Sequence, residues 1–255
     1  MNSIQAVPLV TVITPTTGSP FLSKALDGIA AQSYGAIQHL VVIDGAERAA
    51  NARAQLSGRS VDVIELPYPT GTDRYNGHRI YAAATFLGKG DFFCFLDEDN
   101  WPDCDHVESL VSVLKAGNEW AFSMRKVVDK DGNIVCPDNC ESLGKWPTVL
   151  SPKDYLVDVN CFMLPRKLAV LVAPIWYRKA REPGVTEVDR MITEVLRAKT
   201  KRFDSNYLYS MNYRAGNTPR SVKATFFLNG NAKMATRFRN GFPWDRQKVP
   251  QNGSP

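Results

Sequence analysis

The feature that most constrains the fold is an alternation of short apolar runs and amphipathic stretches over the first 125 residues. Continuous apolar runs of this kind are typical of strands in a parallel sheet, because such strands are buried on both faces. The expected strands cover 9–13, 39–43, 61–66 and 92–96. The stretches between them predict helices over 20–32, 47–57 and 76–87. This repeated β-α-β order predicts an α/β fold with a mostly parallel central sheet flanked by helices.

Polar residues gather where three of the expected strands end. The segment 14–18 follows the first strand, Asp44 follows the second, and Asp97, Glu98 and Asp99 follow the fourth. Ligands of open α/β sheets bind outside the carboxyl ends of the strands, so we expect these residues to border one cleft. Carboxylates two residues apart supply hard oxygen ligands, which suit Mg²⁺ or Mn²⁺ sharing its shell with substrate phosphates. The alternative is a plain acidic turn before the next helix, which leaves the apolar run into three acids unexplained.

Charge is distributed unevenly along the chain. Residues 1–144 carry 11 Lys and Arg against 18 Asp and Glu, whereas residues 145–255 carry 20 against 8. The acidic part suits a metal cation, and the basic part suits phosphates, an acidic acceptor or an anionic membrane surface. The basic residues are scattered and no recognised nucleic-acid motif occurs, so we do not expect nucleic acid as a partner.

Composition indicates a soluble globular protein. Hydrophobic residues make up 44% of the 255 residues and charged residues 22%. We expect one domain over 1–240 and a flexible tail over 241–255, which is rich in Gly, Pro and Asn. No apolar run approaches the roughly 20 residues that span a bilayer, and the first residues lack the pattern of a secretory signal.

The five cysteines are odd in number and irregularly spaced, which indicates reduced thiols in a cytoplasmic protein. Cys136 and Cys140 have the spacing of half a zinc site. No second pair or clustered histidine follows them, so we do not expect zinc.

The order of these motifs resembles that of the family 2 glycosyltransferases with the GT-A fold. The segment 10–16 resembles the opening strand and nucleotide loop of that family, and 41–45 resembles the strand whose Asp contacts the base. The segments 75–84 and 95–101 resemble the helix before the metal motif and the metal motif itself. The resemblance implies a Rossmann-like sheet with a nucleotide-sugar-binding half, 1–125, and a smaller acceptor-binding half, 126–240.

The same resemblance implies roles for individual residues. The nucleoside, most often uridine, would be held by four residues on adjacent strands: Thr14, Pro15, Thr16 and Asp44. Asp97 and Asp99 would address the ribose and the metal, and the triplet containing Glu98 would hold that metal against the donor diphosphate. Arg79 lies in the helix motif, where it can meet phosphate or sugar. Gly45 stands where the family has a second Asp.

Glycosyl transfer also needs a general base for the acceptor hydroxyl. Family members carry this acid at the start of a helix after the sheet, and Glu187 and Asp189 begin an amphipathic stretch that matches this position. Asp189 is the better match and Glu187 the second. The alternative interpretation is a capping box, in which Thr186 and Asp189 only satisfy backbone N–H groups at the helix start.

Two other segments of the second half are candidates for substrate contacts. The run 158–164 predicts a strand on which Asn160 touches sugar hydroxyls, followed by a helix from Arg166. The basic segment 212–223 is expected either to fold over the diphosphate or to form a plain solvated loop.

The predicted function is transfer of a sugar, most often from a UDP-sugar, to a glycan or other hydroxyl acceptor, with Mn²⁺ or Mg²⁺ and with inversion. Two other classes stay open. A nucleotidyltransferase could use the same sheet and acids, but it normally needs a glycine-rich triphosphate loop with Lys or Arg after the first strand, and 16–20 is not one. A catalytically silent sugar-nucleotide-binding module could keep the fold without the base.

Overall fold

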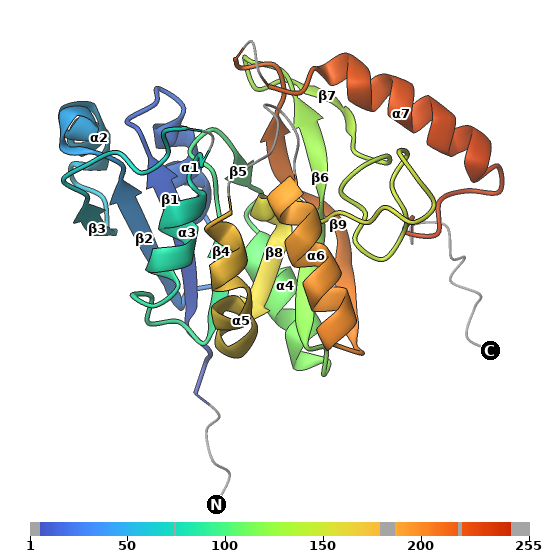
Figure 1. Ribbon diagram of the computed structural model, residues 1–255, viewed down its shortest axis with the longest axis horizontal. Helices are drawn as coiled ribbons and strands as arrows, with labels where there is room; N and C mark the ends of the chain where they lie inside the picture. The colour runs from blue at the N-terminus through green and yellow to red at the C-terminus, as the bar shows by residue number, and fades with distance from the viewer. Residues whose placement is uncertain (1–5, 74, 179–186, 219–220, 246–255) are drawn as a thin grey trace, which may run out of the picture.

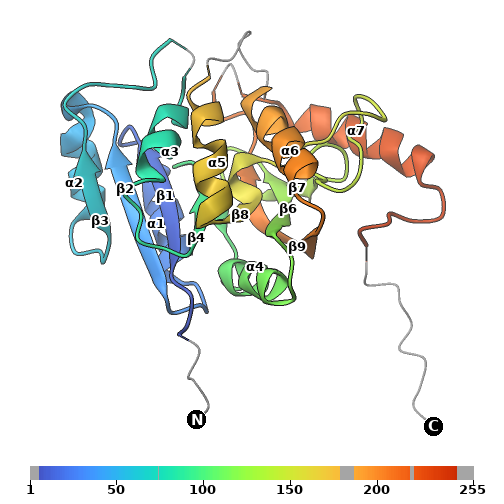
Figure 2. The same ribbon diagram turned by 60° about the horizontal axis from the view of Figure 1, so that its bottom comes forward.

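One curled sheet runs through the molecule and helices cover both of its faces (Figures 1 and 2). The computed structural model describes residues 6–73, 75–178, 187–218 and 221–245. The nine strands of the sheet are β1 (Val10–Thr16), β2 (Ile37–Ile43), β3 (Asp62–Glu65), β4 (Phe92–Phe95), β5 (Trp101–Pro102), β6 (Trp120–Val128), β7 (Ile134–Pro137), β8 (Phe162–Pro165) and β9 (Phe203–Arg214). The helices are α1 (Leu22–Ala30), α2 (Ala49–Leu56), α3 (His78–Ala84), α4 (His106–Lys115), α5 (Arg166–Trp176), α6 (Glu187–Lys199) and α7 (Ala224–Arg237). Two short 3-10 helices are η1 (Ala46–Arg48) and η2 (Val159–Cys161).

The first four strands form the parallel part of the sheet, in the order β3-β2-β1-β4. Val10 of β1 lies opposite Ile37 of β2 on one side and Phe92 of β4 on the other, so all three strands run in one direction. Every residue of β1 is buried, as expected for a strand covered on both faces. The α/β fold and the parallel order predicted from the apolar runs are therefore confirmed.

Beyond β4 the sheet is mixed. Strand β8 is antiparallel to both β4 and β6, β9 is parallel to β6, and the short β5 is antiparallel to β9. Strand β7 returns along β6 as an antiparallel neighbour. Since β6 and β4 point in the same direction, their carboxyl ends lie at the same edge of the sheet.

Three helices, α3, α5 and α6, lie side by side across one face of the sheet (Figure 2). Their apolar sides close an aromatic cluster in which Tyr81 of α3, Phe95 of β4 and Trp176 of α5 have ring centroids 5.2–5.4 Å apart. Buried aromatic side chains of this size contribute strongly to a core. This cluster fixes α3 and α5 against the end of β4, where the acidic triplet begins.

Several element boundaries differ from the sequence prediction. The helix expected over 47–57 is split into η1 and α2. The strand expected over 158–164 is wrong at its start, because η2 precedes β8 there and Asp158 caps it by accepting the N–H of Asn160. A 3-10 turn of this kind cannot be recognised from apolar periodicity alone.

Two expectations near the carboxyl terminus need correction. The segment 212–223 is not one loop, since its first residues complete β9 and Arg214 is buried there, donating to the carbonyl oxygens of Asp99 and Lys130. The flexible tail predicted from residue 241 is wrong for 241–245, because Trp244 is buried and donates to Asn139 at 2.8 Å. Residues 246–255 lie outside the described residues. Within the described residues no helix has the length and apolar character that a bilayer span requires.

Candidate functional site

The acidic triplet follows β4 at the carboxyl edge of the sheet. Its middle residue, Glu98, accepts hydrogen bonds from the end of β1 and the loop that follows it. The Glu98 carboxylate accepts the hydroxyl of Thr16 at 2.5 Å and the hydroxyl of Thr17 at 2.7 Å. It also accepts the backbone N–H groups of Thr17 at 3.2 Å and Ser19 at 3.0 Å. Glu98 therefore joins the end of β4 to the loop after β1, and its carboxylate is occupied by protein donors.

Asp44, at the end of β2, organises the loop that precedes α3. Its carboxylate accepts the backbone N–H of Thr70 at 2.6 Å, the hydroxyl of Thr70 at 2.8 Å and the N–H of Gly71 at 2.9 Å. A Cβ on Gly71 would lie only 2.5 Å from the carbonyl oxygen of Asn76, so a side chain does not fit there without movement. Asp44 is buried at the edge where the resemblance implies a nucleoside.

The side chains of Thr14 and Pro15 point into the protein. The Thr14 hydroxyl is 3.0 Å from Nε2 of His39, and both residues are buried. Burial lowers the pKa of His39 to about 4, with a further contribution from the charge of Arg59. Pro15 is buried beside Gly77, where an added Cβ would be 2.8 Å from the proline ring. Neither side chain is therefore exposed to a ligand in this structure.

Arg79 lies at the amino end of α3 between two tyrosine rings. Its guanidinium carbon is 3.4 Å from the ring centroid of Tyr75 and 5.0 Å from that of Tyr177. One of its Nη atoms donates to the carbonyl oxygen of Thr70 at 3.3 Å. Nε of Arg79 is buried and has no hydrogen-bond partner among the described residues. Arg79 is thus placed beside the Asp44 loop, with one donor unused.

Two neighbouring side chains hold the Asp97 carboxylate. Its Oδ1 accepts the hydroxyl of Tyr81 at 2.7 Å, and its Oδ2 accepts Nδ2 of Asn160 at 2.9 Å. Burial and then the charge of Asp158 raise the pKa of Asp97 to about 6, against the opposing effect of these hydrogen bonds. Each carboxylate oxygen keeps a second lone pair for another ligand.

Asp99 is held by fewer groups. Its Oδ2 accepts the side-chain amide of Asn217. Burial and then the charge of Asp97 raise the pKa of Asp99 to about 7. A divalent metal bound to both acids would favour their ionised forms.

A metal at this position would depend on ligands from the substrate. Among the described residues no group of three or more His, Cys, Asp or Glu side chains is arranged to hold a metal ion alone. Asp97 and Asp99 supply carboxylate oxygens, which fit Mg²⁺ or Mn²⁺ bound by one or two carboxylates together with phosphates and water. The donor set therefore fits a metal that arrives with a diphosphate.

Asp189 reaches the same site from α6, in the second half of the chain. It is buried, and its Oδ2 accepts the backbone N–H of Val159 at 3.2 Å. Burial raises the pKa of Asp189 well above its ordinary value, and the charges of Asp158 and Asp97 raise it further. Glu187, the other candidate base, is the first residue of α6 and is partly exposed. Thr186, the partner in the capping interpretation, lies outside the described residues.

Sequence reasoning missed the residues that hold these acids in place. Tyr81 was counted only as part of a helix motif, and Asp158 only as the start of a strand. The hydrogen bonds that hold Asp97 join residues far apart in the sequence. Tyr81 is 16 positions from Asp97, and Asn160 is 63 positions from it. The one local signal is a polar pair, Asp158 and Asn160, at the entrance to the apolar run of β8.

Asp158 belongs to a buried cluster of charged side chains in the second half of the chain, centred on Arg125. The buried guanidinium of Arg125 donates to Asp138 and Glu141 at 2.8 Å each and also to Asp158. Its carbon lies 4.1 Å from the ring centroid of Tyr213. These carboxylates raise the pKa of Arg125 and outweigh the effect of its burial. The cluster anchors the chain around Asp158 below the site.

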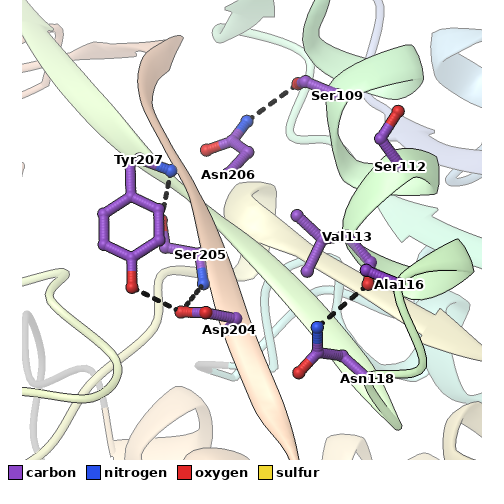
Figure 3. Close-up of a pocket in the computed structure, with 9 residues that line it drawn as sticks. All are labelled: Ser109, Ser112, Val113, Ala116, Asn118, Asp204, Ser205, Asn206 and Tyr207. Atoms are coloured by element: carbon purple, nitrogen blue, oxygen red, sulfur yellow. Dashed lines mark hydrogen bonds between the residues drawn. The ribbon is translucent and has the colours of Figure 1, made fainter. Parts of the chain in front are cut away.

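A surface cavity of about 480 Å³ lies between α4 and the start of β9 (Figure 3). Asn118 and Tyr207 line it near the amino ends of β6 and β9, so it opens at the edge opposite the acids. Its polar groups bond to one another, as when Asn206 donates to Ser109 at 2.9 Å and Asn118 to the carbonyl oxygen of Val113 at 3.0 Å (Figure 3). The cavity is therefore separate from the candidate site.

No family model and no curated protein sequence matches the chain. Several solved structures are similar to it. S. aureus TarS 1-349 in complex with UDP-GlcNAc aligns over 83% of this chain and 60% of its own, with a TM-score of 0.62 and 16% identity. The mannosyltransferase PcManGT from Pyrobaculum calidifontis, in complex with GDP-Man and Mn²⁺, aligns over 93% of this chain and 66% of its own, with a TM-score of 0.57 and 15% identity.

The longer S. aureus TarS structure aligns over 81% of this chain and 37% of its own, with a TM-score of 0.56 and 15% identity. The chain thus spans less than two thirds of the length of these structures. At such low identity the likeness defines the fold. The chain has the GT-A type of fold found in these glycosyltransferases, as the order of its motifs predicted.

Proposed function

We propose that the chain is a nucleotide-sugar glycosyltransferase that binds its donor at the carboxyl edge of β1, β2 and β4. The observation that carries the proposal is the meeting of three acids from separate segments at that edge. Asp97 and Asp99 follow β4, and Asp189 comes from α6. Burial raises the pKa of each of the three carboxyl groups, and the charge of Asp97 further favours the neutral forms of Asp99 and Asp189. The fold shared with TarS and the mannosyltransferase supports the same conclusion.

The proposed reaction is an inverting displacement at the anomeric carbon of the donor. The acceptor oxygen forms a bond to that carbon as the bond to the diphosphate oxygen breaks, and the acceptor proton passes to the carboxylate of Asp189. Its raised pKa makes this carboxylate a stronger base than a solvated Asp. A Mn²⁺ or Mg²⁺ ion, when bound, would offset the charge of the leaving diphosphate, and Asp97 and Asp99 would hold it.

The proposed donor is a UDP-sugar, with the nucleoside beside Thr16 and Asp44. TarS was solved with UDP-GlcNAc and the mannosyltransferase with GDP-Man. Arg79, with an unused Nε beside the Asp44 loop, is proposed to meet a phosphate or the sugar. Thr14, Pro15 and Glu98 are proposed to act by shaping the backbone around the nucleotide.

The proposed acceptor is a glycan or another hydroxyl compound that approaches from the side of Asp189. A cytoplasmic location is proposed on the ground that all five cysteines are free. The basic residues of the second half are compatible with an anionic acceptor or with contact to a membrane surface.

Calorimetric titration with UDP and with GDP, each with and without Mn²⁺, tests the donor site. We expect UDP to bind more tightly with Mn²⁺ than without it, and Asp99→Asn to remove most of this difference. Equal affinity with and without the metal would contradict the metal site. Hydrolysis of a UDP-sugar by the protein would separate an active transferase from a silent binding module, and incorporation of a nucleotide into product would favour a nucleotidyltransferase.

A further inference from the structure

Asn160 occupies a buried position between two carboxylates. Its Nδ2 donates to Oδ2 of Asp97 at 2.9 Å and to Oδ1 of Asp158 at 2.7 Å. Its Oδ1 accepts the backbone N–H of Asp97 at 2.6 Å. Since Asn160 is fully buried and all these polar atoms are engaged, its side chain faces the two acids and is not available to sugar hydroxyls.

Asp158, one of the two carboxylates bound by Asn160, is held in place by the Arg125 cluster. The Asp158 carboxylate accepts a hydrogen bond from a guanidinium N–H of Arg125 through Oδ2 and one from the backbone N–H of Asn160 through Oδ1, the latter at 3.0 Å. Arg125 is itself held by Asp138 and Glu141. A continuous chain of hydrogen bonds therefore runs from the buried guanidinium through Asp158 and Asn160 to Asp97.

An amide is the side chain that this position requires. It offers two N–H donors for two carboxylates and one carbonyl oxygen for the N–H of Asp97, without adding charge. A carboxylate here would be a third negative group beside Asp97 and Asp158 and could not donate to either. A hydroxyl could donate to only one of them.

We propose that Asn160 is a positioning residue, which sets the orientation of the Asp97 carboxylate and couples the donor site to the Arg125 cluster. This inference rests on the proposed function, because it assigns Asp97 to the nucleotide and its metal. Through Asn160, the second half of the chain determines the geometry of an acid that the first half supplies. Tyr81 holds the other oxygen of Asp97, so the carboxylate is fixed at both ends.

The test compares two buried asparagines that undergo the same substitution. In Asn160→Asp the donors to Asp97 and Asp158 are lost. Asn139→Asp retains the side-chain oxygen that accepts hydrogen bonds from the indole N–H of Trp244, at 2.8 Å, and from the hydroxyl of Tyr209. In the described structure Asn139 touches none of the site acids. Calorimetry with UDP and GDP over a series of Mn²⁺ concentrations, together with melting temperatures, provides the readout.

We expect Asn160→Asp to weaken nucleotide binding in Mn²⁺ by about 10- to 150-fold, the effect of losing the hydrogen bond to the charged carboxylate of Asp97, and to raise the Mn²⁺ concentration needed for half-saturation. Asn160→Ser, which keeps one donor, should lose less, and it replaces Asn160→Asp if that variant does not fold. Asn139→Asp should leave both quantities unchanged.

Three outcomes decide between the proposals. Normal nucleotide and Mn²⁺ affinities in folded Asn160→Asp or Asn160→Ser would overturn the positioning role and leave the donor site standing. Equal losses in Asn139→Asp would reduce the effect of Asn160 to general stability and would also overturn it. A failure of the unmutated protein to bind either nucleotide would instead overturn the donor site itself, and the inference with it.

Discussion

Buried polar groups are stabilised differently in the parallel part of the sheet and in its mixed part. Around β1, β2 and β4 the carboxylates of Asp44 and Glu98 are held by nearby loops, as Asp44 is held by Thr70. Around β6 and β8 a full ion cluster centred on Arg125 lies inside the protein. The acids of the parallel part are therefore held by backbone N–H and hydroxyl groups, whereas those of the mixed part are held by a buried guanidinium.

The largest expected effect tests whether the mixed part of the molecule supplies the general base. Asp189→Asn keeps the shape of the side chain and removes its basicity, so transfer should fall by roughly 10²- to 10⁴-fold. Donor affinity and melting temperature should stay close to those of the unmutated protein, because Asn keeps a side-chain oxygen that can accept the backbone N–H of Val159. Initial rates and calorimetry measure the two effects. Glu187→Gln is the control, and a large loss of rate in that variant alone would transfer the role of base to Glu187.

The next effect tests the difference in buried charge. Arg125→Met removes the cation that Asp138, Glu141 and Asp158 share, and should lower the free energy of unfolding by about 3–5 kcal/mol. Arg53→Met breaks a pair with Glu65 on the parallel part, in which the Arg53 side chain is 66% exposed, and should cost no more than about 1 kcal/mol. Chemical denaturation of both variants gives the comparison. Similar losses would mean that the two parts do not differ in this respect.

A pH effect is expected inside the parallel part, where His39 faces Thr14. Its pKa is lowered from 6.5 to about 4 by burial. The unfolded chain binds a proton between these values and the folded protein does not, so stability falls as the pH is lowered from about 6.5 to about 4. His39→Gln does not titrate and should lose up to about 3 kcal/mol of this dependence. Denaturation at several pH values measures it, and an unchanged slope would contradict the assignment to His39.

The smallest effect concerns the nucleoside. Asp44→Ala removes the acceptor that organises the loop at Thr70 and Gly71, and it should weaken UDP binding by roughly 5- to 150-fold. Asp62→Ala, at a partly exposed carboxylate on β3, is the control and should bind UDP normally. Unchanged affinity in Asp44→Ala would place the base elsewhere along the edge.

The sequence was informative about the parallel part because its signals are local. Apolar runs marked β1, β2 and β4, and the acids that follow them lie at the sheet edge as predicted. It did not reveal how those acids are held. Glu98 turns into the loop after β1, and Asn160 faces Asp97 instead of solvent. Such contacts depend on the closing of the sheet, which no spacing along the chain encodes.

The second part was predicted less well for the same reason. Asp189 was placed at the start of a helix by its resemblance, and the structure brings it beside Asp97 and Asp158. The antiparallel pairing of β8 and the short η2 were not expected. Arg125 could not be recognised as buried, because an isolated Arg in an apolar strand has no local mark of the acids that surround it.

The bond between Glu98 and the loop after β1 limits how this protein could be redesigned or could diverge. Thr16, Thr17 and Ser19 all donate to that single carboxylate. An exchange of the loop alone, intended to change the preferred base, would remove the donors on which Glu98 depends and disturb the neighbouring acids. The loop and residue 98 therefore depend on each other, and a substitution in one requires a compensating substitution in the other.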